Sequence, residues 1–474
     1  MPFVMLLVAA APLGAQSLTA ESADAALRKA VGFYREHVSV QGGYLWRYSE
    51  DLSLREGEGD ATATLAWVQP PGTPSVGQAY LTAYERTGEP YLLEAAVETA
   101  RALVKGQLAS GGWDYRIEFD PQKRGTYAYR VDGAPGPRAR NVTTLDDNTT
   151  QSALRFLMHV DRTLKFADGP IHSAVEYALN QLREAQYPNG AWPQRFSAPP
   201  KDEDYPVVKA NYPATWSRTY PGTNYMDYYT LNDNAQADVI DTMFEAAEIY
   251  GNQQYFESAR RGGDFLILAQ MPEPQPAWAQ QYNAQMQPAW ARKFEPPSIT
   301  GGESQGAIRI LMQVYRQTGD KKYLEPIPRA LDYLEKSQLP GNRIPRFLEL
   351  KTNRPLYFTR QYELVYTDDD LPTHYGFITG LTTSRLRSDY ERLVATPADQ
   401  LKRERTPERF RPSDDLTAAA GRVVAELDSR GAWVEEGKLA HAGGGNRPAE
   451  KILDMRTFAR NVDTLSRYLA AGKR

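Results

Sequence analysis

The pattern of apolar and polar residues predicts three long helices that begin at similar polar loops. Apolar residues recur at intervals of three and four, as on one face of a helix, over 153–160, 239–249 and 307–314. A polar, acid-bearing loop comes directly before each of these runs, at 144–151, 230–236 and 300–305. Asp, Asn and Ser are typical of helix N-termini, where they accept hydrogen bonds from free N–H groups. The three segments therefore resemble copies of one unit.

The acidic residues of these loops are candidates for a shared site. N-capping accounts for one polar residue in each loop, but not for the run Asp146, Asp147 and Asn148 or for Asp233 between two asparagines. If the three helices are equivalent, their N-termini lie on one face and the loops converge. Clustered carboxylate and amide oxygens suit a hard cation such as Ca²⁺.

The order of elements around the loops predicts stacked helix hairpins. Four segments share the sequence helix, short Gly- or Pro-containing turn, second helix and Gly/aromatic loop: 78–113, 151–194, 236–278 and 305–342. Incomplete units stand at 25–46 and 416–469. A single hairpin cannot bury its apolar face, so successive hairpins must stack. We predict an all-α fold, an α/α toroid of antiparallel hairpins with few short strands. Long irregular insertions are expected at 114–142, 198–227 and 366–411.

Composition limits the classes of partner that the protein can bind and indicates the compartment in which it acts. The net charge of −4 argues against a nucleic-acid partner, and cysteine is absent, so no disulfide is expected. Residues 1–17 are apolar and end in small residues, as in a signal peptide, and no other stretch is apolar enough to cross a membrane. We expect a periplasmic or secreted monomer. Residues 18–474 would form one catalytic domain, with N-terminal repeats (18–142), a core (143–375) and C-terminal helices (376–474).

Arginines in later loops suggest an acidic ligand. Arg292, Arg346, Arg354 and Arg360 follow second helices, and guanidinium groups bind carboxylates through two hydrogen bonds. An isolated loop arginine is more often exposed or weakly paired. Aromatic loops, including the one with Trp192, offer flat faces that suit either sugar stacking or packing. Together with the acids, these residues indicate an anionic sugar polymer bridged to the protein through a metal.

Several ordered motifs resemble a known family. They are Thr-Leu-Asp at 144–146, Tyr-Pro-Asn-Gly-Ala-Trp-Pro-Gln at 187–194, Leu-Asn-Asp-Asn-Ala at 231–235, Pro-Ala-Trp-Ala-Arg at 288–292, Gly-Gly-Glu-Ser at 301–304 and the run at 346–356 that begins Arg-Phe-Leu-Glu-Leu. With these motifs the sequence resembles polysaccharide lyase family 10, the pectic acid (pectate) lyases. The resemblance covers roughly residues 145–375.

The resemblance implies an enzyme that cleaves pectate (polygalacturonate) by β-elimination with Ca²⁺ between protein and substrate. It implies that Asp146 and Asp233 belong to the calcium or substrate site and that Arg292 is the base that removes the C5 proton. Arg346 and Arg360 would bind uronate carboxylates.

Four further residues complete the predicted substrate site. Asp147 and Asn148 adjoin Asp146 in the first acidic loop, Trp192 stands in an aromatic loop, and Arg354 belongs to the arginine set.

Two other functions remain open from the residues alone. An α/α-barrel glycoside hydrolase could use Asp147 and Asp233 as acid and base, and a separation of roughly 6.5–9.5 Å between their carboxyls would support inversion. A catalytically inactive periplasmic glycan-binding protein is the other alternative. Two copies of Gln-x-x-x-Gly-x-Trp, at 107–113 and 186–192, also resemble a triterpene cyclase motif, which we interpret as shared repeat packing.

Overall fold

The computed structural model describes residues 18–401, 410–441 and 450–472, so the predicted signal peptide at 1–17 lies outside the described residues. Within them the chain is mostly helical and its strands are two to four residues long, which confirms the all-α class. The helices are α1 (Ala20–Phe33), α2 (Thr73–Thr87), α3 (Pro90–Gly106), α4 (Thr149–Thr163), α5 (Gly169–Glu184), α6 (Ala235–Tyr250), α7 (Gln253–Ala269), α8 (Gly301–Thr318), α9 (Ile327–Lys336), α10 (Thr383–Ala395), α11 (Asp414–Ala425) and α12 (Met455–Gly472).

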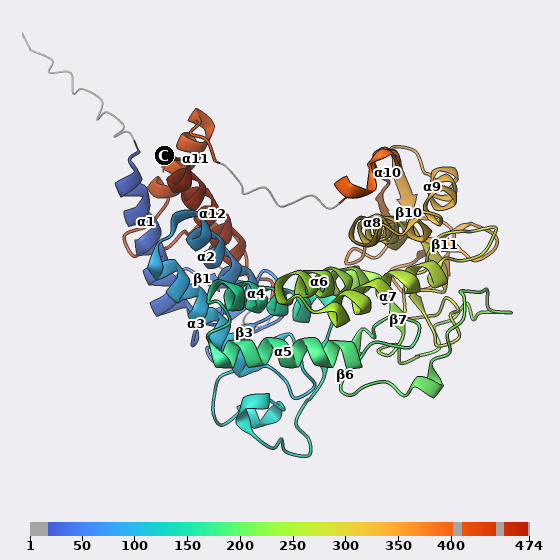
Figure 1. The fold of residues 1–474 in the computed structure, drawn as a ribbon, viewed down its shortest axis with the longest axis horizontal. Coiled ribbons are helices and arrows are strands. Elements are labelled where there is room, and N and C mark those ends of the chain that lie inside the picture. The colour runs from blue at the N-terminus through green and yellow to red at the C-terminus, as the bar shows by residue number, and fades with distance from the viewer. Residues whose placement is uncertain (1–17, 402–409, 442–449, 473–474) are drawn as a thin grey trace, which may run out of the picture.

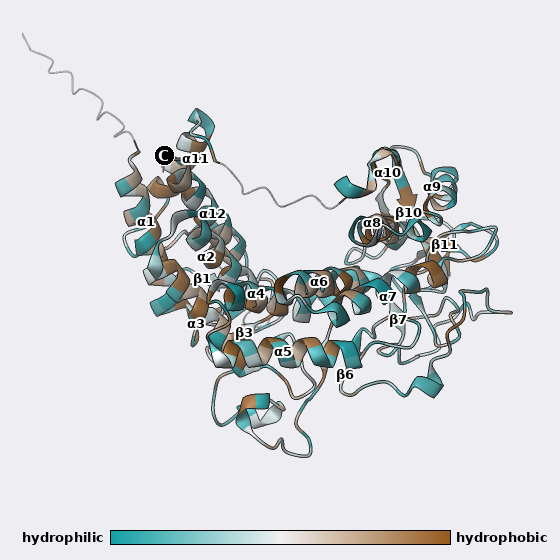
Figure 2. Ribbon diagram, in the orientation of Figure 1, coloured by the Kyte–Doolittle hydropathy of each residue, from teal (hydrophilic) through white to brown (hydrophobic). Residues whose placement is uncertain are grey.

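The helices form two rows that follow an open arc (Figure 1). In the inner row α12 packs on α2, α2 on α4, α4 on α6, α6 on α8, and α8 on α10. In the outer row α1 packs on α3, α3 on α5, and α5 on α7. Each outer helix also pairs with an inner one, as in α2 with α3 and α6 with α7. These pairs are the predicted stacked hairpins, and apolar residues lie where the two rows face each other (Figure 2).

Both ends of the described chain meet in one unit. The last helix, α12, packs against α1 and α2. Strand β1 (Arg47–Ser49) pairs antiparallel with β16 (Lys451–Asp454), and the Arg86 guanidinium lies 2.6 Å from a carboxylate oxygen of Asp463. The two incomplete sequence units are therefore one complete hairpin layer built from opposite ends of the chain.

The repeated Gln and Trp residues are packing elements. The indole N–H of each repeat tryptophan donates to a carbonyl of the preceding outer helix at 2.8–2.9 Å, in Trp113, Trp192, Trp278 and Trp433. The side-chain amides of Gln107 and Gln186 each donate to a carbonyl in their own loop and to one in the next outer helix. The motif Gln-x-x-x-Gly-x-Trp thus joins one repeat to the next, as interpreted from the sequence.

Short antiparallel strand pairs hold the loops at the N-termini of three inner helices. Before α4, β5 (Thr143–Thr144) pairs with β6 (Arg195–Phe196). Before α6, β7 (Tyr229–Thr230) pairs with β8 (Gln281–Tyr282). Before α8, β9 (Ser298–Thr300) pairs with β11 (Phe347–Glu349). Because α4, α6 and α8 are neighbours, the three acidic loops lie on one face, as predicted.

The remaining strands connect loops around this face and the chain ends. They are β2 (Arg55–Glu56), β3 (Leu65–Trp67), β4 (Arg116–Glu118), β10 (Arg343–Pro345), β12 (Pro355–Phe358), β13 (Leu364–Val365), β14 (Ile378–Gly380) and β15 (Glu435–Glu436). Four-stranded sheets run in the orders β15-β16-β1-β2 and β13-β12-β11-β9.

The segment 366–411, expected to be irregular, contains helix α10. This helix is strongly polar, so its sequence carries a weak apolar signal. Leu386 and Leu393 are nevertheless buried, because they lie seven residues apart on the face turned toward α8 and α9.

Candidate active site

The first two acidic loops have the same backbone geometry. Each forms a single 3-10 turn, at Asp146–Asn148 and Asn232–Asn234, before its inner helix. In each turn two successive residues adopt a left-handed conformation: φ is 50° and 57° at Asp147 and Asn148, and 50° and 59° at Asp233 and Asn234. Non-glycine residues rarely adopt this conformation, and it costs free energy. The duplicated turn directs carboxylates away from the helix axes into a common space.

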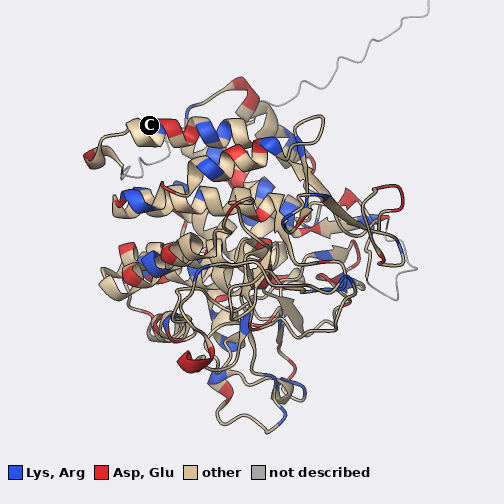
Figure 3. Cartoon of the chain, turned by 90° about the vertical axis from the view of Figure 1, so that its right-hand side faces the viewer, with Lys and Arg blue, Asp and Glu red and all other residues tan. Residues whose placement is uncertain are grey.

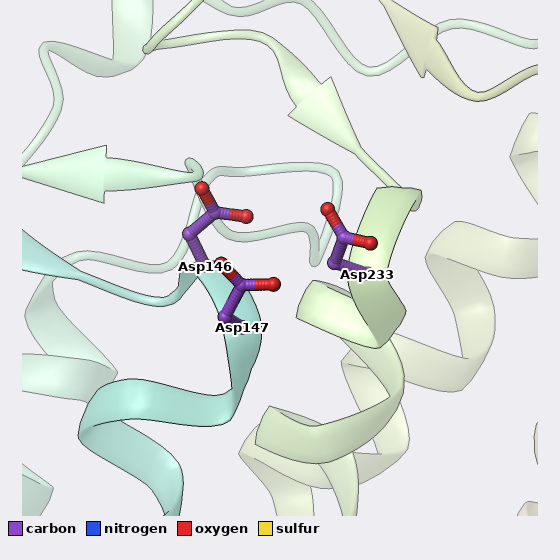
Figure 4. Close-up of side chains that lie close together, drawn as sticks. All are labelled: Asp146, Asp147 and Asp233. Carbon is purple, nitrogen blue, oxygen red and sulfur yellow. The ribbon is translucent and has the colours of Figure 1, made fainter. Parts of the chain in front are cut away.

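Three carboxylates meet in that space (Figure 4). One oxygen from each of Asp146, Asp147 and Asp233 lies within 4.8 Å of the others. The Tyr115 hydroxyl donates to Asp146 at 2.8 Å, and the Gln69 side-chain amide donates to Asp147 at 2.9 Å. The second oxygen of Asp146, Oδ1, is buried and has no hydrogen-bond partner in the described chain. The cluster is therefore oriented by its neighbours but leaves acceptor capacity for a ligand.

The carboxylates line a cleft of about 410 Å³, which we call the acid cleft. Arg195, Arg292, Glu295 and Tyr375 line its other walls, together with Gln194, Gln280 and Gln281. Buried polar atoms without a hydrogen-bond partner are concentrated at the described lining residues: Gln194 Oε1, Arg195 Nε, both amide atoms of Gln280, and Gln281 Oε1. Buried polar groups are ordinarily paired, so this concentration fits a cleft whose partners come from a bound polar ligand.

Burial and neighbouring carboxylates raise the pKa values of Asp147 and Asp233. Burial, followed by the charges of Asp146 and Asp233, raises the pKa of Asp147 to about 7. The exposed Asp233 lies at the cleft edge, where desolvation of its carboxylate and the charge of Asp146 raise its pKa to about 6. Both charged forms are therefore unfavourable without a counter-charge. An all-oxygen donor set with a buried, unpartnered carboxylate oxygen fits a calcium ion, which would supply that counter-charge.

This electrostatic strain predicts a specific pH dependence. Between pH of about 4 and 7 the folded protein retains protons on Asp147 and Asp233 that the unfolded chain has lost. In chelator, wild type should therefore lose stability relative to Asp147→Asn as pH rises through this window, by about 1–2 kcal/mol after allowing for solvent screening. Urea denaturation of both proteins at several pH values measures the difference. A difference that stays constant with pH would contradict the crowding, and added calcium should restore the wild type above pH of about 7.

Arg292 lies at the acid cleft, as predicted, but in a bidentate ion pair. Its Nε and Nη2 donate to the two Glu295 carboxylate oxygens at 2.9 and 2.6 Å. Burial lowers the pKa of Arg292, but the hydrogen bonds and charge of Glu295 outweigh burial and the pKa is raised. The Tyr375 hydroxyl donates to Glu295 at 2.8 Å and fixes the pair. Arg292 Nη1 makes no hydrogen bond to the described residues, so one donor edge remains for a ligand.

Arg346 connects the second and third acidic loops. Its Nη2 donates to Asn232 Oδ1 at 3.0 Å and to Glu303 at 3.3 Å. Its guanidinium lies 4.4 Å from the centre of the Tyr375 ring, and its buried Nε has no partner in the described chain. Arg346 is therefore beside the acid cleft, in contact with Asn232 and Tyr375, which line it.

The structure does not bring Arg354 and Arg360 to the acid cleft. Arg354 stacks on the Tyr366 ring at 3.5 Å. Arg360 lies in the turn between β12 and β13, is 66% exposed and forms an ion pair with Asp370 at 3.3 Å. The resemblance did not determine the position of Arg360, because this hairpin extends the arginine away from the inner-helix ends.

The structure corrects the prediction that Trp192 contacts the sugar. Its side chain is fully buried, and its indole N–H is used by the carbonyl of Leu182. The ring therefore has no face free to stack on a sugar.

Asn148 is partly buried beside the cluster, and its Oδ1 has no partner in the described chain.

Sequence reasoning missed several groups of this site. Tyr115 and Gln69 lie before the recognised motifs, and Arg195 directly follows the motif at 187–194. Arg195 could have been found, because it pairs across β5 and β6 with the strand that enters the first acidic loop. Tyr375 and Glu295 showed no signal, since neither belongs to a repeat position.

A larger hollow lies elsewhere and lacks this chemistry. It measures about 1090 Å³ and lies at the C-terminal ends of α6 and α8, where Phe244 and Gln313 contribute to its wall. The acidic loops are at the opposite ends of these helices.

Over the surface, charges of both signs are interspersed (Figure 3), so attraction of an anion depends on local arginines and bound cations.

The stacked hairpins and the acid-and-arginine cleft at the inner-helix N-termini define an α/α-toroid enzyme. Residues 107–314 match the family described as Pectic acid lyase, a span that contains the first two acidic loops, Arg195 and Arg292. This match bears out the resemblance of the motifs to that family.

Solved structures with similar folds include carbohydrate-active enzymes. The family 10 polysaccharide lyase from Cellvibrio cellulosa is 20% identical, with a TM-score of 0.47 over 68% of this chain and 97% of that one. A mutant of a family 10 lyase from the same organism, in complex with trigalacturonic acid, is 19% identical, with a TM-score of 0.46 over 68% and 98% of the two chains. A sugar epimerase from a ruminal bacterium is 11% identical, with a TM-score of 0.45 over 96% and 100%. A search of curated proteins gives no match.

Proposed function

We propose that the protein cleaves pectate by calcium-assisted β-elimination in the acid cleft. The observation that carries the proposal is the cluster of Asp146, Asp147 and Asp233 in one cleft with Arg292, within the span that matches the lyase family. Carboxylates alone would repel a uronate polymer. Combined with a divalent cation and arginines, they form a site for its carboxylate groups.

The chain's own residues have separable roles in this proposal. Asp146, Asp147 and Asp233 would hold calcium, which when bound neutralises a uronate carboxylate and so acidifies the neighbouring C5–H. Arg346 and the free edge of Arg292 donate hydrogen bonds to carboxylate oxygens as negative charge develops there. Tyr115 and Gln69 fix the orientations of Asp146 and Asp147 through the hydrogen bonds described above.

Elimination breaks the C5–H and C4–O4 bonds of the substrate. Arg292 removes the C5 proton, the electron pair of the C5–H bond forms the second bond between C4 and C5, and O4 leaves with the C4–O4 electron pair and takes a proton from water. Arg292 can accept the C5 proton only after losing one of its own to water, and its pair with Glu295 opposes that loss. We therefore propose that substrate binding opens the Arg292–Glu295 pair before proton transfer.

The geometry disfavours the inverting hydrolase. Oxygens of Asp147 and Asp233 approach within 4.8 Å, whereas an inverting pair needs roughly 6.5–9.5 Å between its carboxyls to admit a water molecule.

We also propose that the enzyme acts as a monomer in the periplasm or outside the cell. The leader-like sequence at 1–17 and the extracellular nature of pectate support this location. None of the described helices is both long and apolar enough to cross a membrane.

The function is tested by the chemistry of the product. Purified protein incubated with polygalacturonate and calcium should form an unsaturated uronate that absorbs in the ultraviolet. One new double bond should form for each glycosidic bond that is cleaved. Reducing ends that appear without this absorbance would indicate hydrolysis instead. If pectate binds but no bond breaks under any condition of pH and calcium, the protein is a glycan-binding protein.

A further inference from the structure

A second cleft adjoins the acid cleft on its N-terminal side. It measures about 420 Å³ and shares the lining residues Glu58 and Tyr115 with the acid cleft, so the two clefts are adjacent. We call it the N-terminal cleft. Glu58 and Trp67 precede the residues that match the lyase family, and the wall also includes Arg116 of β4. The N-terminal repeats thus contribute directly to a binding surface beside the proposed catalytic centre.

Arg116 is the distinctive group of the N-terminal cleft. It lies directly across the β3–β4 pair from Trp67, and its guanidinium lies 4.8 Å from the centre of the indole ring. The indole covers one face of the guanidinium and limits its movement. The N–H groups along the edges of the guanidinium can then donate hydrogen bonds to a planar acceptor. Arg116 makes no ion pair with a carboxylate in the chain segments that the structure describes.

The other charged groups of the N-terminal cleft either form an ion pair with each other or can accept hydrogen bonds from a sugar. Asp114 forms a close ion pair with Arg140, so neither contributes a free charge. Glu58 stands at the junction of the two clefts, where its carboxylate can accept hydrogen bonds from sugar hydroxyls. Tyr115 and Tyr127 supply aromatic walls. Arg116, the carboxylate acceptor and the aromatic rings together match an acidic sugar.

The N-terminal repeats are also connected to the acid cluster. Gln69 follows β3, is nearly buried, and receives the indole N–H of Trp67 on its side-chain oxygen at 3.0 Å. Its amide donates to Asp147, and its backbone carbonyl accepts from the Trp46 indole at 2.8 Å. One rigid group of side chains thus fixes both clefts relative to each other.

We infer that the N-terminal cleft binds a further uronate residue of the same polymer, with Arg116 paired to its carboxylate. This inference rests on the proposed function, because it takes the substrate to be a polyuronate. It gives the N-terminal repeats a role in extending the substrate-binding surface, so that longer oligouronates bind more tightly than short ones.

The test compares oligomers of two lengths without turnover. Calorimetric titration of the Arg292→Ala protein with trigalacturonate and hexagalacturonate, in calcium, gives the affinity for each. Adding Arg116→Ala should weaken hexamer binding about tenfold, the effect of losing one charge-assisted pair, with a much smaller change for the trimer. Arg116→Lys should recover part of the loss, because it keeps the charge but not the planar fork.

Arg138→Ala is the matched control, an exposed arginine of the neighbouring loop that lines neither cleft. It should leave both affinities unchanged. Equal affinities with and without Arg116, or an equal loss for trimer and hexamer, would overturn the inference. A wild-type protein that forms no unsaturated product but still loses hexamer affinity in Arg116→Ala would refute the lyase function while keeping the cleft assignment.

Discussion

Replacing Arg292 by alanine should lower kcat on pectate by about a thousandfold or more, with little change in the melting temperature. The guanidinium lines the acid cleft beside the aspartates, its Nη1 makes no hydrogen bond to the described residues, and Arg292 lies within the span that matches the lyase family. Loss of a group that moves a proton and stabilises developing negative charge has effects of this size. The measurement is the initial rate of ultraviolet absorbance at saturating pectate and calcium. Arg101→Ala is the control, since Arg101 is an exposed residue paired with Asp168 on the outer helices.

A second variant separates proton removal from simple charge stabilisation. Glu295 holds Arg292 in its charged form, and Arg292 in turn keeps the pKa of Glu295 low despite burial. If Arg292 is the base, Glu295→Gln should lower its pKa in the free enzyme and shift the rise of kcat/KM with pH toward lower pH. If kcat/KM falls equally at all pH values in Glu295→Gln, the guanidinium acts only as an oriented cation and the proposed base is wrong.

Replacing Asp146 by asparagine should weaken calcium binding about a hundredfold and abolish activity at low calcium. Asp146 supplies a carboxylate with one buried oxygen that has no partner among the described residues, so the substitution removes both a negative charge and a ligand already oriented by Tyr115. Calcium titration by calorimetry, followed by activity at increasing calcium, measures both effects.

Asp238→Asn is the matched control for the calcium site. Asp238 lies in the first turn of α6, close in sequence to Asp233, and its pKa is likewise raised to about 6 by burial, but it lines neither cleft. Calcium affinity that falls as much in Asp238→Asn as in Asp146→Asn would show that general negative charge, and not the cluster, attracts the ion.

The sequence predicted the repeat and the convergence of the acidic loops because both depend on local pattern. Apolar spacing identified the inner helices, and the polar residues before them identified the ends that carry Asp146 and Asp233. Arg292 also lies where the motif implied. Each of these features depends on a short stretch of sequence whose surroundings the repeat itself sets.

The errors and omissions concern residues whose position depends on distant partners. Trp192 stands in a loop whose composition is typical of sugar binding, but its indole N–H donates to a backbone carbonyl of the preceding helix. Arg360 projects from a hairpin whose direction no motif fixes, and Gln69 reaches Asp147 across 78 positions of sequence. Contacts of this kind are set by how the hairpins stack, which a single sequence does not encode locally.

The layer that joins the two ends of the chain has a consequence for biosynthesis. Helix α12 packs on both α1 and α2, which precede it by most of the chain, so these two helices have no partner for one apolar face until α12 has been synthesised. The wall that carries Gln69 and Glu58 belongs to this early part of the chain. The layer formed by α1, α2 and α12 therefore closes only after residue 455 has been synthesised, and a chain that stops before it leaves apolar residues of α1 and α2 exposed to water.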